Sequence, residues 1–174
     1  MHTIFKHAAA ITVSVLLFGC DGAPSPADSI ETDVSQETIA VDTYCGNGGC
    51  EAVPSATVTL TLDASASLPE NDAVHFLQYR VDYALSAVDD IPYFAGETDI
   101  ALEGTQTVSV SFPIAGNRQR EHIFNAVGGK RISGTAQVTL EGYDEKDQLV
   151  DIAFSTTVIF ADFTIESDTE GAMP

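Results

Sequence analysis

Three cysteines carry the most distinctive chemistry in this 174-residue chain. Cys45 and Cys50 enclose the short sequence GNGG, and Cys20 lies near the N-terminus. A closely spaced cysteine pair can bind a metal ion, exchange disulfides or form a structural disulfide. The compartment decides among these, because thiols stay reduced in the cytosol and pair in oxidising compartments.

The N-terminal segment has the features of an export signal. Lys6 lies in a short basic region, and residues 8–18 follow without a charge. As a helix this run would measure about 16 Å, whereas the hydrocarbon core of a bilayer is about 30 Å thick. A signal peptide over residues 1–19 therefore fits better than a membrane span.

The end of this segment, Leu17-Phe18-Gly19-Cys20, resembles the lipobox of bacterial lipoproteins. The resemblance implies cleavage after Gly19, lipidation of Cys20 and attachment of the mature chain to a membrane of the bacterial cell envelope. The resemblance is compatible with attachment to the inner or the outer membrane, and with the periplasmic or the surface side. The alternative is an ordinary secretory signal in which Cys20 has no such role.

Export makes a disulfide the simplest interpretation of Cys45 and Cys50. The glycines between them permit the positive-φ backbone of a tight loop. A structural zinc site needs four ligands, and only His75 and His122 remain after the signal peptide. A redox pair usually has Cys-x-x-Cys spacing, which differs from the spacing here. We therefore predict a disulfide that closes an entry loop over residues 44–55.

The sequence of this loop, CGNGGC, also resembles the openings of cysteine-rich repeats in secreted proteins of myxobacterium-type organisms. Those repeats continue with further cysteines, whereas this chain has three in all. The resemblance therefore covers one loop and implies no function.

The chain is strongly acidic. It has 26 acidic and seven basic residues, so the loss of Lys6 with the signal peptide leaves six basic residues and a formal charge of −20. Such a charge repels nucleic acid and anionic lipid surfaces, and we predict no nucleic-acid partner. Residues 20–43 contain six acids, no base and few apolar side chains, a composition that predicts a disordered acidic tether.

Four of the six basic residues of the mature chain lie within 14 positions of one another and flank the apolar side chains of residues 123–127. These residues, the basic cluster, are Arg118, Arg120, Lys130 and Arg131. In so acidic a chain they predict a recognition patch for an anionic partner, such as an envelope protein or an anionic glycan. The alternative is a loop whose cations pair with neighbouring acids.

Acidic residues gather at three places, 89–90, 97–99 and 144–147. Their carboxylates could supply oxygen ligands to calcium, or they could simply form polar hairpin tips. No spacing among them matches an EF-hand, and we predict no metal site.

The sequence shows no catalytic constellation. His75 is expected to face inward from a strand and His122 to lie at the surface, so neither joins a Ser-His-Asp set. No glycine-rich phosphate loop follows a strand and opens a helix. We predict neither enzymatic activity nor a cofactor.

Alternating apolar and polar residues predict the strands that position these groups. Residues 56–62 alternate without a fault. The alternation returns in four later runs: 75–85, 108–114, 136–141 and 149–163. In the first of these, the odd-numbered residues from Leu77 to Leu85 are expected to face inward. A short strand is expected at 99–102, and residues 118–127 fit either a strand or a helical turn.

Six or seven strands separated by turn signals predict an all-β chain with a single antiparallel two-sheet β-sandwich over residues 56–165. A flexible tail is expected at 166–174. The strand spacing resembles immunoglobulin-like and fibronectin-like domains, and this resemblance concerns architecture only.

The predicted function is that of a lipid-anchored, non-catalytic binding or structural module of the bacterial cell envelope, attached to the membrane through its N-terminal lipid. The alternative is a calcium- or glycan-binding accessory domain of a larger envelope system. Neither the partner nor the oligomeric state follows from the sequence.

Overall fold

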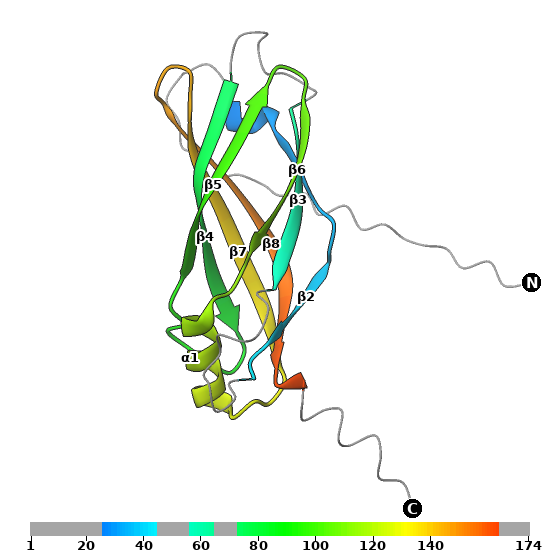
Figure 1. Ribbon diagram of the computed structural model, residues 1–174, viewed down its shortest axis with the longest axis vertical. Helices are drawn as coiled ribbons and strands as arrows, with labels where there is room; N and C mark the ends of the chain where they lie inside the picture. The colour runs from blue at the N-terminus through cyan, green and yellow to red at the C-terminus, as the bar shows by residue number, and fades with distance from the viewer. Residues whose placement is uncertain (1–25, 45–55, 65–72, 164–174) are drawn as a thin grey trace, which may run out of the picture.

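A computed structural model of the chain describes residues 26–44, 56–64 and 73–163 (Figure 1). The elements before the helix are η1 (Pro26–Ser29), β1 (Glu31–Val34), β2 (Thr38–Asp42), β3 (Thr57–Asp63), β4 (Ala73–Leu85), β5 (Phe94–Glu103) and β6 (Thr107–Pro113). The helix and the strands after it are α1 (Asn117–Val127), β7 (Ile132–Asp144) and β8 (Leu149–Ala161). The chain is therefore mostly β-strand.

The strands form two sheets. One has the order β1-β3-β6, and the other has the order β2-β8-β7-β4-β5. Among the pairs that the described strands form, β2 runs parallel to β8 and every other pair is antiparallel. The strands run along the length of the molecule, with η1 and the β7–β8 turn at one end and α1 at the other (Figure 1). We call these the η1 end and the α1 end.

Apolar side chains of both sheets share one core. The predicted inward faces of residues 56–62 and 136–141 are confirmed, since Val58, Leu60 and Leu62 are fully buried, as are their counterparts in β7. At the centre, the ring of Tyr79 on β4 lies 4.5 Å from that of Phe112 on β6, measured between centroids. This contact joins the two sheets through aromatic packing.

Strand β4 departs from the predicted alternation at Leu77. Its register against both β5 and β7 shifts between Phe76 and Gln78, which is the signature of a β-bulge. The buried residues of this strand are Val74, Phe76, Tyr79 and Val81. Leu77 and His75 are exposed, so the prediction that they face inward is wrong. An irregularity of one residue reverses the phase of the alternation, and the sequence does not mark where it occurs.

The predicted tether over residues 20–43 is wrong from Pro26 onward. β1 pairs with β3, and β2 pairs with β8. Ile39 and Val41 alternate with exposed neighbours and enter the core. Composition averaged over 24 residues hides this local alternation, and the acids of the segment lie mainly on exposed or half-exposed positions.

Two other expectations are refined. Residues 118–127 form a helix, and the strand expected at 99–102 is part of the longer β5. The predicted signal peptide (1–19), nearly all of the entry loop (44–55) and the tail (166–174) lie outside the described residues.

Within the described ranges, neither helix combines the length and the hydrophobicity that crossing a membrane requires.

Candidate functional site

Helix α1 carries two residues of the basic cluster and is fixed by hydrogen bonds at both ends. Gln119 Oε1 accepts the N–H of Gly116 (3.1 Å), and Gln119 Nε2 donates to the carbonyls of Pro92 (3.2 Å) and Tyr93 (2.8 Å). The helix ends at Gly128, whose left-handed φ of 64° is typical of a C-terminal cap. The helix is thereby held against the segment that leads into β5.

Tyr83 secures the chain just before this helix. Its hydroxyl donates a hydrogen bond to the carbonyl of Ile114. Burial raises the pKa of Tyr83, so the hydroxyl remains a donor across the physiological pH range. Strand β4 therefore positions the start of α1.

The two arginines of α1 lie in opposite environments. Arg118 is exposed, whereas Arg120 is 1% exposed and among the largest fully buried side chains. Burial lowers the pKa of Arg120, and the negative charge of Asp42, at the end of β2, acts in the opposite direction. Arg120 is therefore a buried structural residue, and the prediction that it contributes to a recognition patch is wrong.

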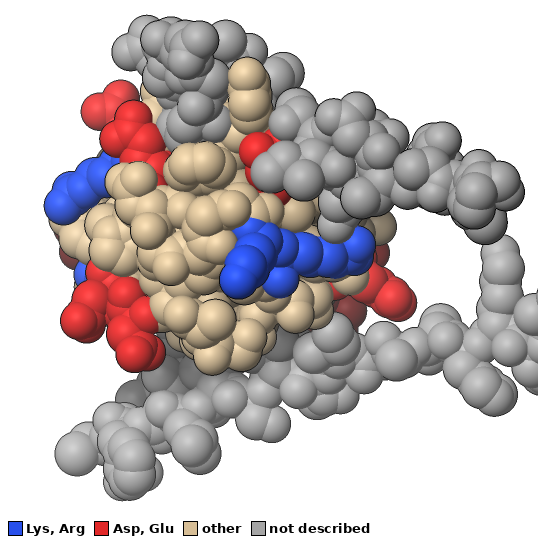
Figure 2. All heavy atoms as spheres, turned by 90° about the horizontal axis from the view of Figure 1, so that it is seen from below, with Lys and Arg blue, Asp and Glu red and all other residues tan. Residues whose placement is uncertain are grey.

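The remaining members of the basic cluster are at the surface. Lys130 and Arg131 follow α1 and are exposed, as is Arg118. We call these three residues the cationic end. Viewed from the α1 end, Lys and Arg side chains lie over the middle of the surface and at one edge, with Asp and Glu mainly around the rim (Figure 2).

The acidic loops do not converge. Asp89 lies beside α1, where its carbonyl oxygen is 3.4 Å from His122 Nε2, whereas residues 144–147 form the turn at the η1 end (Figure 1). Asp144 Oδ1 accepts the N–H groups of Lys146 and Gln148, both at 2.8 Å. This carboxylate thus shapes the turn. Among the described residues, no group of three or more His, Cys, Asp or Glu side chains is arranged to hold a metal ion.

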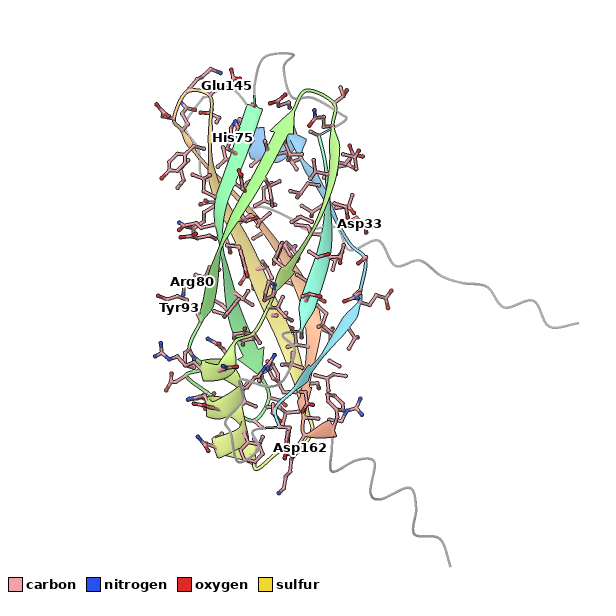
Figure 3. All side chains as sticks on the ribbon, in the orientation of Figure 1. Asp33, His75, Arg80, Tyr93, Glu145 and Asp162 are labelled. Atoms are coloured by element: carbon pink, nitrogen blue, oxygen red, sulfur yellow. The ribbon has the colours of Figure 1, made fainter. Side chains whose placement is uncertain are left out.

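A charged group on the outer face of β4 was not singled out from the sequence. Arg80 forms two hydrogen bonds with Asp82 (2.8 and 2.9 Å), and its guanidinium carbon lies 4.4 Å from the ring centroid of Tyr93 (Figure 3). The hydrogen bonds that Arg80 donates to the Asp82 carboxylate raise the pKa of Arg80. The alternation around Arg80 predicted that it points outward, but nothing near Tyr93 in the sequence indicated that the two side chains meet.

Two carboxylates face each other farther along the same sheet. Glu141 on β7 is the register partner of Asp151 on β8. Asp151 is exposed, but partial desolvation of its carboxylate raises its pKa, and the charge of Glu141 adds to this effect. Gln78 Nε2 donates to Glu141 Oε2 at 2.6 Å. This pair of like charges is partly offset by one amide and represents a local cost to the fold.

The predicted lipidation residue Cys20 and the predicted disulfide partners Cys45 and Cys50 lie outside the described residues, so their chemistry remains a prediction.

No protein-family model matches the chain, and no curated protein does either. Among solved structures, the chain is similar to the ASH/PapD-like domain of human CEP192 (PapD-like domain 7), with 13% sequence identity and a TM-score of 0.35. The similarity covers 88% of this chain and 96% of that chain. A similarity of this extent says nothing about function.

Proposed function

We propose that this protein is a lipid-anchored, non-catalytic binding module of the bacterial cell envelope, whose cationic end meets an anionic partner. The observation that carries this proposal is that the segment next to Cys20 and the cationic end lie at opposite ends of the molecule. The described chain begins at η1, six residues after Cys20, whereas the cationic end lies at the opposite end (Figure 1). An anchor at Cys20 would direct the cationic end away from the membrane.

The anchor would be the acyl chains on Cys20. Each buried methylene contributes about 0.8 kcal/mol, and more than one chain makes attachment stable. Residues 20–25 can span at most about 20 Å even when fully extended. The η1 end would therefore stay close to the bilayer.

The scaffold would be an immunoglobulin-like β-sandwich. Its support is the single core to which both sheets contribute, with the Tyr79–Phe112 contact between them. Such a scaffold presents loops and helices at its two ends, which suits a module that is anchored at one end and binds at the other.

The partner would carry carboxylate or phosphate groups, as an acidic glycan or an acidic envelope protein does. A formal charge of −20 on the mature chain repels anions in general. Three exposed cations gathered at one end offer anions a local attraction. Comparing retention on untreated and on protease-treated envelope material distinguishes a glycan partner from a protein partner.

The test reverses charge at the cationic end. In the Cys20→Ser background, which lacks the acyl chains, Arg118→Glu with Lys130→Glu should abolish retention on native envelope material and leave the melting temperature nearly unchanged, because both side chains are exposed. Retention of the Cys20→Ser protein without charge reversal should weaken with salt, since exposed charges are screened within about 8 Å at physiological ionic strength. Lys146→Glu, in the turn at the η1 end, is the charge-matched control for Lys130→Glu alone. Retention that survives the double reversal would overturn the proposal.

The covalent features have direct tests. Mass spectrometry of the native protein should show a diacylglyceryl group on Cys20, and a mature chain that retains residues 1–19 would contradict this. Thiol labelling of the denatured, unreduced protein should find Cys45 and Cys50 unreactive. Full labelling of both would contradict the disulfide.

A further inference from the structure

Three large apolar side chains are exposed on the five-stranded sheet toward the η1 end. Leu77, Tyr143 and Leu149 are 49%, 46% and 61% exposed, and we call them the apolar patch. Tyr143 on β7 is the register partner of Leu149 on β8 and of His75 on β4, and opposite Cβ atoms lie about 4.5–5.5 Å apart. His75 lies at the η1 end (Figure 3), so its register partner Tyr143 and the partner of Tyr143, Leu149, lie at that end as well.

The composition of this face changes along its length. Toward the α1 end the outward residues of β4 and β7 are polar: Gln78, Arg80, Asp82, Gln137 and Thr139. Toward the η1 end, the bulge in β4 leaves Leu77 outside, and Tyr143 and Leu149 occupy outward positions. Scattered exposed apolar residues are ordinary, whereas a group on neighbouring strands indicates a contact surface.

We propose that the apolar patch rests on the lipid bilayer to which the chain is anchored, so that the domain lies against the membrane instead of standing free of it. This inference rests on the proposed anchor at Cys20. Only five residues, 21–25, separate Cys20 from η1, and residues 20–25 together reach about 20 Å at most. Tyr143 and Leu149 flank the β7–β8 turn, which lies at the same end as η1 (Figure 1), so the patch stays within reach of the lipid surface.

The short attachment allows a small patch to suffice. A group joined to its target by a short connection experiences an effective concentration in the millimolar range. A contact too weak to bring a free domain to the membrane can therefore dominate once the domain is anchored. Tyr143 suits the membrane interface, because its ring is apolar and its hydroxyl can stay in water.

The surrounding charge selects the kind of lipid. Glu145 and Asp147 outnumber Lys146 in the exposed turn that joins Tyr143 to Leu149, so anionic headgroups repel this turn. Docking should therefore be stronger on zwitterionic phosphatidylethanolamine and phosphatidylcholine than on membranes rich in phosphatidylglycerol.

The absence of tryptophan from the chain permits a direct test. Tyr143→Trp introduces a single reporter into the full acylated protein, which is reconstituted in phosphatidylethanolamine/phosphatidylcholine vesicles with brominated acyl chains. Its emission should fall about twofold or more, because an interfacial side chain reaches the boundary of the acyl region. Tyr93→Trp is the matched control. Tyr93 is 56% exposed and lies beside α1 through the Gln119 bond to its carbonyl, so this reporter should stay bright.

A second variant keeps the test specific. In the Tyr143→Trp protein, Leu77→Ser with Leu149→Ser should restore most of the emission, and replacing much of the lipid by phosphatidylglycerol should do the same. Protein that floats with the vesicles but has an unquenched Trp at 143 overturns the docking alone. So does equal quenching at 143 and 93, or a dimer in solution that buries position 143. Protein that does not float contradicts the anchor itself, and the docking falls with it.

Discussion

Arg118 and Arg120 show how two neighbouring positions on one helix acquire different roles. Residues two apart on an α-helix are separated by about 200° around the axis, so a helix that is buried on one side cannot expose both. Arg120 lies on the side with Ile123, which is fully buried. A loop or a strand would have placed Arg118 and Arg120 differently. The sequence pattern of residues 118–127 fitted either a strand or a helical turn and did not decide between the two.

Arg120→Ala should lower the free energy of unfolding by about 2–4 kcal/mol, because it leaves a cavity and removes a positive charge near Asp42. Arg118→Ala should change it by no more than about 0.5 kcal/mol, since this side chain is exposed. Urea denaturation measures both. Arg120→Met keeps much of the volume and separates packing from charge. Equal, small effects of both alanine variants would show that Arg120 is not buried in solution.

Asp151 makes stability depend on pH in a predictable direction. Its pKa is raised in the folded state by partial desolvation and by Glu141, so the ionised form is disfavoured by folding. The resulting cost is present above the folded pKa, declines as pH falls through it, and is absent below the unfolded value of about 3.9.

Asp151→Asn should therefore stabilise the fold at pH 7, by about 0.2–1 kcal/mol as for directly opposed like charges. The gain should shrink toward zero as the pH is lowered below about 4. Denaturation of both proteins at several pH values measures this. Glu145→Gln removes one charge from the exposed turn and controls for the general relief of net charge. An equal gain from this control would refute the specific pairing with Glu141.

At the scale of elements, β2 is the part of the fold that the sequence indicated least. Its five residues lie in an acidic segment, and its parallel partner β8 begins more than 100 positions later in the chain. Pairing over such a distance depends on the whole topology, which local periodicity does not encode.

Ile39→Ala should lower the free energy of unfolding by about 2–4 kcal/mol, because Ile39 is 4% exposed and its truncation leaves a cavity in the shared core. Glu37→Ala, at an exposed position just before β2, should have little effect. Thermal or urea unfolding of the two variants decides the matter. A disordered segment would be indifferent to both changes.

Strands β4 and β7 approach each other closely beside the bulge in β4. A Cβ on Gly142 of β7 would lie 2.1 Å from the carbonyl oxygen of His75 and 2.7 Å from the Cα of Phe76. Backbone atoms cannot yield as side chains do, so Gly142→Ala should cost about 3 kcal/mol.

Gly104→Ala provides the comparison for this variant. Gly104 has a φ of +58° and nothing within 4 Å of the added atom, so this change should cost only the strain of about 1–2 kcal/mol for a left-handed residue. Both costs are measured by urea denaturation. A smaller loss at Gly142 than at Gly104 would mean that the strands do not approach so closely.

The alternating strands were the most predictable part of the molecule. Residues 56–62 and 136–141 form strands with the expected inward faces, because each buries one face throughout. The phase of β4 was not predictable, since one extra residue reverses it. Of the basic cluster, sequence spacing correctly placed three residues at the surface, but it could not identify the helix rotation that buries Arg120. The apolar patch was missed because its members come from three strands and from the bulge.

At the scale of the whole molecule, charge and attachment define a direction. The cationic end lies beside α1, whereas the turn with exposed Glu145 and Asp147 lies at the η1 end. An anchor near η1 places the η1 end against the bilayer and directs the cationic end away from it. Contact with the bilayer must then come from apolar side chains, because the charges at that end do not favour it.

The length of the connection should control this contact. Inserting about 24 Gly/Ser residues between Gly22 and Ala23 lengthens the segment before η1 from six residues to about 30, and an effective concentration that falls as the −3/2 power of length drops about tenfold. The emission of the Tyr143→Trp reporter in brominated vesicles should rise accordingly, while flotation stays complete because the acyl chains are unchanged. The same insertion within residues 166–174 leaves the anchoring segment intact and should not alter the emission. If the N-terminal insertion also leaves the quenching unchanged, the patch binds lipid without help from the short attachment, and the anchored geometry is not what brings it to the membrane.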